Sequence, residues 1–67
     1  MKMYAVAVFS HHTGSITQFM SYNASELEVL KVLYLKEFGT PAPDEDTENA
    51  IYEAFYDTDQ VVSIMEV

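Results

Sequence analysis

The first part of the chain has the hydrophobic pattern of a β-hairpin. Residues 3–10 are rich in β-forming side chains, and both faces of an extended strand would be apolar here. One face would carry Tyr4, Val6 and Val8, and the other Met3, Ala5, Ala7 and Phe9. Two apolar faces predict a central strand that is covered on at least one side. The polar residues 11–14 end in a glycine that can adopt positive φ, so residues 15–22 are predicted to return as a second strand.

A helix is predicted over residues 25–38. Ser25 and Glu28 have the spacing of a capping box, and Gly39 followed by Pro41 marks the end. Apolar residues occupy most of the circumference of this helix instead of one stripe. One sheet cannot cover all of them, so part of this helix should remain exposed or meet a partner.

The remaining pattern predicts a second helix and a last strand. Residues 40–43, with two prolines, form a stiff connection. Asp44, Asp46 or Thr47 can cap a helix that extends to about Tyr56. Its buried stripe would consist of Ala50, Ile51, Ala54 and Phe55. Residues 57–60 have the composition of a turn, and residues 61–67 that of a strand.

The element order β-β-α-α-β predicts a single α+β domain over residues 1–67, with a three-stranded sheet and both helices packed on one face. The pattern leaves the strand order open. A right-handed crossover is expected if the last strand enters beside the first. Three strands leave two open edges, and an open apolar edge can pair with another chain, so a homodimer is one expectation.

Composition narrows the class of protein. A chain of 67 residues forms one domain with a small core. It contains no cysteine, which suits a reducing cytoplasm, and its apolar N-terminal stretch is too short to span a membrane. The apolar fraction of 49% and the high aromatic content of 13% are too large for a disordered acidic tail. We therefore expect a folded cytoplasmic protein with no membrane contact.

Charge is the strongest functional signal. The formal net charge is −8, and residues 44–59 contain seven carboxylates but no lysine or arginine. Holding so much like charge in a compact domain costs self-repulsion, which favours a positively charged protein partner. The only cations are Lys2, Lys31 and Lys36, so the chain lacks the basic surface that direct nucleic-acid binding requires.

Metal and catalytic chemistry find little support in the sequence. Asp44, Asp46 and Glu48 alternate like the first ligands of a calcium loop, but Asn49 stands where that loop needs glycine and Phe55 where it needs glutamate. His11 and His12 are adjacent and would point to opposite sides of an extended chain. No nucleophile elbow or glycine-rich oxyanion loop accompanies the serines and histidines. We expect no cofactor, no metal ligand and no catalytic residue.

The aromatic residues of the two predicted helices are expected to lie mostly in the core, and two of them are also candidates for an interface. The aromatic residues of both helices are Tyr34, Phe38, Tyr52, Phe55 and Tyr56. Tyr52 and Tyr56 lie off the buried stripe of the second helix, and tyrosine is favoured at interface hot spots. The predicted partner-binding residues are Asp44, Glu45, Asp46, Glu48, Tyr52, Glu53, Tyr56, Asp57 and Asp59.

Residues 50–62, with the sequence AIYEAFYDTDQVV, resemble the C-terminal helix, acidic connector and strand of the small antitoxin of T-even bacteriophages. That family has an opening hairpin, helical structure and a closing strand, and it blocks host RNA-cleaving toxins by direct contact. The present chain differs in its two prolines between the helices and in its stronger negative charge. The resemblance implies a class: a phage-type accessory protein that inhibits a host defence or nucleic-acid-processing factor in the host cytoplasm.

Two hypotheses follow. In the first, a noncatalytic protein uses the acidic second helix to occupy a basic nucleic-acid-binding cleft on a host toxin, nuclease or polymerase, with carboxylates standing in for phosphates. In the second, the chain is a structural or regulatory homodimer that buries the first helix and a strand edge, and its acidity serves solubility alone. An enzyme is disfavoured because no group of residues provides nucleophile, base and charge stabiliser.

Overall fold

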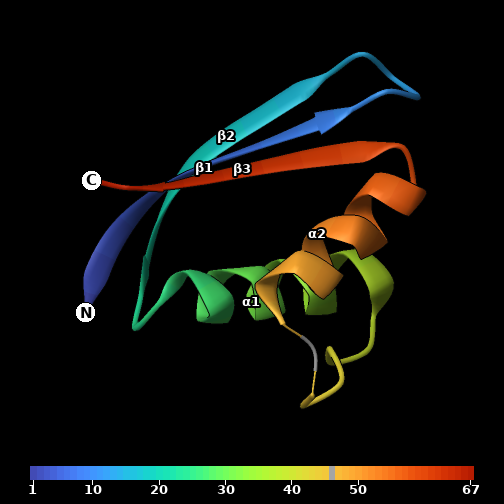
Figure 1. The fold of residues 1–67 in the computed structure, drawn as a ribbon. Coiled ribbons are helices and arrows are strands. Elements are labelled where there is room, and N and C mark those ends of the chain that lie inside the picture. The colour runs from blue at the N-terminus through green and yellow to red at the C-terminus, as the bar shows by residue number, and fades with distance from the viewer. Residues whose placement is uncertain (46) are drawn as a thin grey trace.

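The computed structural model describes residues 1–45 and 47–67 and confirms the predicted element order. The strands are β1 (Lys2–Ser10), β2 (Ile16–Asn23) and β3 (Gln60–Glu66), and the helices are α1 (Glu26–Phe38) and α2 (Glu48–Asp57). Both helices lie on the same side of the sheet (Figure 1). The predicted α+β fold, with two helices on one face of three strands, is therefore correct.

The sheet has the order β2-β1-β3, and β1 is antiparallel to both neighbours. The central position of β1 agrees with its two apolar faces. The strand order could not be derived from the sequence, because either edge of the hairpin offers hydrogen-bonding groups to a third strand. β2 and β3 form the two open edges of the sheet.

Local signals fix the ends of both helices. The Ser25 hydroxyl accepts a hydrogen bond from the Glu28 amide, and Gly39 ends α1 at φ 75°, a conformation that glycine adopts without a steric penalty. The Thr47 hydroxyl caps α2 by accepting from the Ala50 amide, so Thr47 is the cap among the three predicted candidates.

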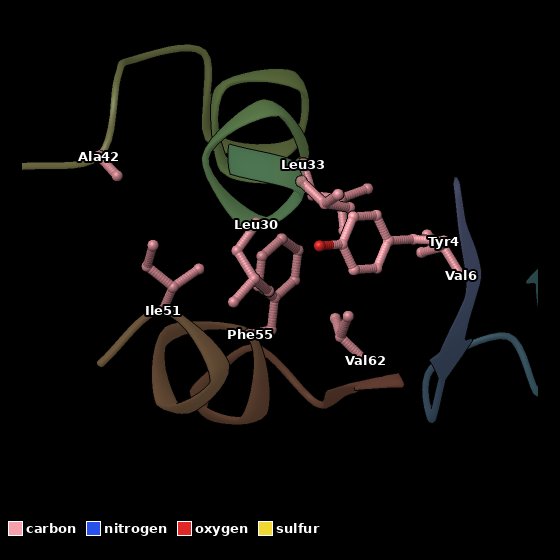
Figure 2. Close-up of a cluster of buried hydrophobic side chains, with 9 residues drawn as sticks. Tyr4, Val6, Leu30, Leu33, Ala42, Ile51, Phe55 and Val62 are labelled. Carbon is pink, nitrogen blue, oxygen red and sulfur yellow. The ribbon is translucent and has the colours of Figure 1, made fainter. Parts of the chain in front are cut away.

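The core lies between the sheet and the helices, and Figure 2 shows its side chains pointing toward one another from both layers. The buried residues are Tyr4, Val6, Val29, Leu30, Leu33, Ala42, Ile51, Phe55 and Val62. The aromatic rings continue this core between the helices, because Phe38 lies 5.4 Å from Phe55 and 4.5 Å from Tyr34 between ring centroids. The predicted buried stripe of α2 is confirmed for Ile51 and Phe55, which are buried, while Ala50 and Ala54 are half-buried.

The structure adds Ala42 to the core, a residue that the sequence pattern placed only in a stiff connection. Conversely, α1 leaves Val32 and Leu35 exposed, with 55% and 49% of their surface accessible. This agrees with the prediction that one sheet cannot cover the apolar residues around the first helix.

The other face of the sheet, which we call the outer sheet face, is covered by no element of the described chain (Figure 1). Side chains alternate between the two faces of a strand, and residues paired across strands share a face. Because Tyr4, Val6 and Val62 point into the core, the alternate positions point outward. The outer sheet face consists of Met3, Ala5, Ala7 and Phe9 from β1, Ile16, Gln18, Met20 and Tyr22 from β2, and Val61, Ser63 and Met65 from β3.

Candidate functional site

The solvent side of α2 brings three of the predicted residues together. Tyr56 lies one turn after Tyr52 and Glu53, at separations of four and three positions, so its side chain is a neighbour of both on the helix surface. They line a shallow groove with Gln60, Val61 and Val62 of β3, which we call the α2–β3 groove. Of the two tyrosines in this groove, Tyr56 is the more exposed to solvent, with 69% of its surface accessible.

The α2–β3 groove runs along an open edge of the sheet. The Val67 amide donates to the Met3 carbonyl, and the His11 amide donates to the Asp59 carbonyl, so odd-numbered residues at this end of the chain bond to β1. In an antiparallel pair the alternate residues direct their backbone groups away from the partner. The backbone groups of Val62 and Ile64 therefore face the open edge, where a ligand could bond to them.

Tyr52 has a different environment from Tyr56. Its hydroxyl donates a hydrogen bond to Glu26 Oε2 at 3.1 Å, which connects α2 to the first turn of α1. Burial, and then this hydrogen bond, raise the pKa of Tyr52 to about 12. The Tyr52 hydroxyl therefore remains a donor throughout the physiological range, and it is already used within the molecule.

Glu48 begins α2 next to the beginning of α1. A hydrogen bond with Glu26, followed by desolvation and the negative charge of Glu26, raises the pKa of Glu48 above its ordinary value. Two carboxylates thus share one end of the helical layer, and both lie close to Tyr52. Glu26 joins this group although the sequence pattern did not identify it as a site residue.

The turn between α2 and β3 holds the last acidic residues of the predicted set. Asp59 adopts φ 61°, a left-handed conformation that aspartate tolerates better than most residues. Its Oδ2 lies 3.2 Å from His12 Nε2, so this carboxylate contacts the hairpin turn. His11, Tyr56 and Asp59 line a second small hollow here, while Asp57 ends α2 on the surface.

The residues that precede α2 lie apart from the α2–β3 groove. Asp44 and Glu45 are exposed, and Asp44 lines a separate depression with Lys31 and Leu35 of α1. Asp46 lies outside the described residues. The predicted site is therefore divided between the groove, the start of α2, the following turn and the preceding connection.

The residues of the groove that sequence analysis missed belong mainly to β3. Gln60, Val61 and Val62 were assigned to a turn and a strand, and nothing in their pattern indicates that α2 packs beside them. Gln60 also donates a hydrogen bond to Glu37 at 3.0 Å, which fixes the start of β3 against α1. Gln60, Val61 and Val62 line the groove only because segments far apart in the sequence come into contact, so no local sequence signal could have identified them as site residues.

Among residues 1–45 and 47–67, no three histidine, cysteine, aspartate or glutamate side chains are placed to hold a metal ion together. Phe55, at the position where a calcium loop needs its last ligand, is buried in the core. Within the same residues, none of the helices has the length and apolar character needed to cross a membrane.

Comparison with known proteins adds no relative: no family model, curated protein or solved structure matches this chain significantly. The resemblance of residues 50–62 to the phage antitoxin therefore stays a prediction.

Proposed function

We propose that this protein is a noncatalytic inhibitor that binds a basic, nucleic-acid-binding surface of another protein through the α2–β3 groove and the carboxylates around it. The observation that carries the proposal is the combination of an exposed aromatic residue, Tyr56, with Glu53, Asp57 and an open strand edge. Tyrosine supplies apolar contact area, and carboxylates supply the charge that a phosphate-binding cleft selects.

The residues of the proposed surface have different roles. Tyr56, Glu53 and Asp57 face solvent and would contact the partner directly. Tyr52 and Glu48 are engaged with Glu26, so they would shape the surface and contribute to its field. Asp59 would contribute charge while holding the turn. Asp44 and Glu45 would steer approach from a neighbouring region, because charge acts over about a Debye length of 8 Å at physiological salt.

The resemblance to the phage antitoxin supports a class of target. An accessory protein of this kind would act in the cytoplasm of a bacterial host, and its targets would be an RNA-cleaving toxin, a nuclease or a defence factor. Such enzymes bind polyanions through lysine and arginine clusters. A folded acidic surface can occupy these clusters without carrying a nucleotide, which makes nucleic-acid mimicry the proposed mode of inhibition.

Affinity capture from bacterial lysate, followed by mass spectrometry, tests this proposal. We expect nucleic-acid-binding proteins to be retained at low salt, to be released by added nucleic acid, and to bind about 10-fold or more weakly at 0.5 M than at 0.05 M NaCl. The site variant is the double substitution Glu53→Gln and Asp57→Asn, which removes two charges beside Tyr56.

The matched control is the double substitution Glu28→Gln and Glu66→Gln, which removes the same charge away from the α2–β3 groove. Glu28 is exposed on α1, and Glu66 forms a surface ion pair with Lys2. If the two double variants retain the partner equally, charge acts without a defined site and the groove is not the binding surface. Failure to retain any nucleic-acid-binding protein would refute the proposal itself.

A further inference from the structure

The outer sheet face has no charged side chain, in a chain where 21% of residues are charged. All of its side chains are apolar except Gln18 and Ser63, and several large ones are open to solvent. Ile16, Met20, Tyr22, Val61 and Met65 keep 61%, 52%, 63%, 42% and 67% of their surface accessible, respectively. An antiparallel sheet with one solvated face normally carries polar residues on that face. This face therefore has the composition of a surface that becomes covered.

The face also has a defined shape. Ala5 of the central strand lies directly between Met20 of β2 and Met65 of β3, because it pairs with both. Small side chains between two large ones leave a hollow, whose lining includes Ala5, Ala7, Met20 and Met65. Methionine side chains are flexible and fill irregular gaps, so they suit insertion into such a hollow on a facing surface.

We propose that the outer sheet face binds the same face of a second copy, forming a two-fold homodimer. This inference does not depend on the proposed inhibitory function. In a two-fold interface the same patch meets itself, so Met20 and Met65 of each copy would fill the alanine hollow of the other. The two sheets would pack about 10 Å apart, as in a β-sandwich.

Charge distribution favours a second copy over other occupants. Two chains of net charge −8 can associate only through a surface that keeps their carboxylates apart. Here the helical layer lies behind each sheet, so the carboxylates of α1 and α2 in opposing copies would be separated by about 25–30 Å, several Debye lengths at physiological salt. An anionic membrane would repel this negatively charged chain. A basic partner would gain no electrostatic attraction from a face without charged side chains.

The available area is sufficient for a stable dimer. The exposed apolar side chains and their uncharged neighbours offer on the order of 800 Å² per copy, the amount that each partner buries in a standard-size interface. A continuous apolar patch on a monomer usually covers only about 300–600 Å². The dimer would cover Val61, which belongs to both surfaces, but would leave the α2 side of each α2–β3 groove accessible, because α2 lies on the helix side of the sheet (Figure 1).

Sedimentation velocity of the purified chain between about 1 and 100 µM tests the proposal. We expect the wild type to be a dimer across the upper part of this range. Met65→Lys and Met20→Lys should each weaken association at least about 100-fold, because a two-fold interface buries each introduced charge twice. Val32→Lys is the matched control: Val32 is 55% exposed, but it lies on α1, and this variant should remain dimeric.

A monomeric wild type at 100 µM would overturn the proposal. So would a dimer that Val32→Lys dissociates while Met65→Lys does not, since that result places the contact on α1. A dimer insensitive to all three substitutions would assign the contact to a strand edge and would also overturn it.

Cross-linking provides a second measurement that does not require a charged substitution. The chain has no cysteine, so Ser63→Cys introduces a single thiol at the centre of the outer sheet face. A short bis-maleimide should link two Ser63→Cys copies efficiently. The control Asn49→Cys, exposed on α2, should link at least about 10-fold less. Equal linking of both variants would contradict the proposed interface.

Discussion

At the scale of single residues, the contact between Glu26 and Glu48 changes the chemistry of the surface most clearly. These carboxylates begin two different helices, and Tyr52 donates a hydrogen bond to one of them. A helix N-terminus favours negative charge. The raised pKa of Glu48 indicates that hydrogen bonding and repulsion from Glu26 favour its protonated form. The acidic surface thus contains one carboxylate whose charge costs folding free energy.

This pair predicts a pH dependence of stability. The pKa of Glu48 in the folded state lies above its ordinary value of 4.5. The stabilising contribution of protonated Glu48 is therefore fully present below pH 4.5 and is lost as the pH rises through the raised value. Glu48→Gln keeps a hydrogen-bond donor toward Glu26 without a charge. We expect the melting temperature of this variant, relative to wild type, to increase between pH 4 and pH 7.

The control for this measurement is Glu53→Gln, which removes one charge from the solvent side of the same helix. Its melting temperature relative to wild type should change less over the same pH interval. If the two variants behave identically, general charge repulsion rather than the Glu26 contact determines the effect.

At the scale of elements, capping residues determine where the helices begin and end. Gly39 has φ 75°, and an added Cβ would meet nothing within 4 Å. Its requirement for glycine therefore comes from backbone conformation and not from crowding. Ser25 acts at the other end of α1 by accepting the Glu28 amide hydrogen bond. These local effects explain why the predicted limits of α1 agree with the structure.

Gly39→Ala is expected to reduce the free energy of unfolding by about 1 kcal/mol, because alanine is strained at positive φ. Ser25→Ala should cost a similar amount, about 1 kcal/mol, through loss of the N-cap. Urea unfolding followed by circular dichroism measures both. Thr40→Ala, at an exposed neighbouring position, should change stability by less than about 0.5 kcal/mol. A Gly39→Ala variant as stable as the Thr40→Ala control would contradict this account of the C-cap.

At the scale of the whole molecule, the fold separates an uncharged face from a charged one. The outer sheet face has no charged side chain, while the carboxylates of α1, α2 and the following turn lie on the helix side or at the ends of the strands. The Lys2–Glu66 ion pair and the contact between His12 and Asp59 occur at opposite ends of the sheet. This arrangement lets one small domain present two chemically different surfaces at once.

The net charge predicts opposite salt effects on stability and on binding. Self-repulsion among like charges destabilises the folded state, and added salt screens it. Raising NaCl from 10 to 300 mM should increase the melting temperature by roughly 4–8 °C if screening recovers about 1 kcal/mol. Over the same range, binding to a basic partner should weaken. Differential scanning calorimetry tests the first effect, and the Glu53→Gln and Asp57→Asn double variant should show a smaller increase.

The sequence by itself determined the elements, their approximate limits and the packing of both helices on one face of the sheet, but not which face receives them. These features depend on alternation of apolar residues, on capping residues such as Ser25 and Thr47, and on glycine at the end of α1, all of which act over a few positions. It also predicted that acidic residues and two tyrosines lie off the buried stripe of the second helix, which the structure confirms for Tyr56, while Tyr52 is partly buried against the core.

Only the tertiary structure decided the strand order, the burial of Ala42, the contact of Tyr52 with Glu26 and the pairing of α2 with the edge of β3. Tyr52 and Glu26 are 26 positions apart, so their contact depends on how the helices pack. The same packing divided the predicted acidic set and left the outer sheet face open. Local patterns encode which side of a strand or helix is apolar, whereas its neighbour is selected by packing of the whole chain.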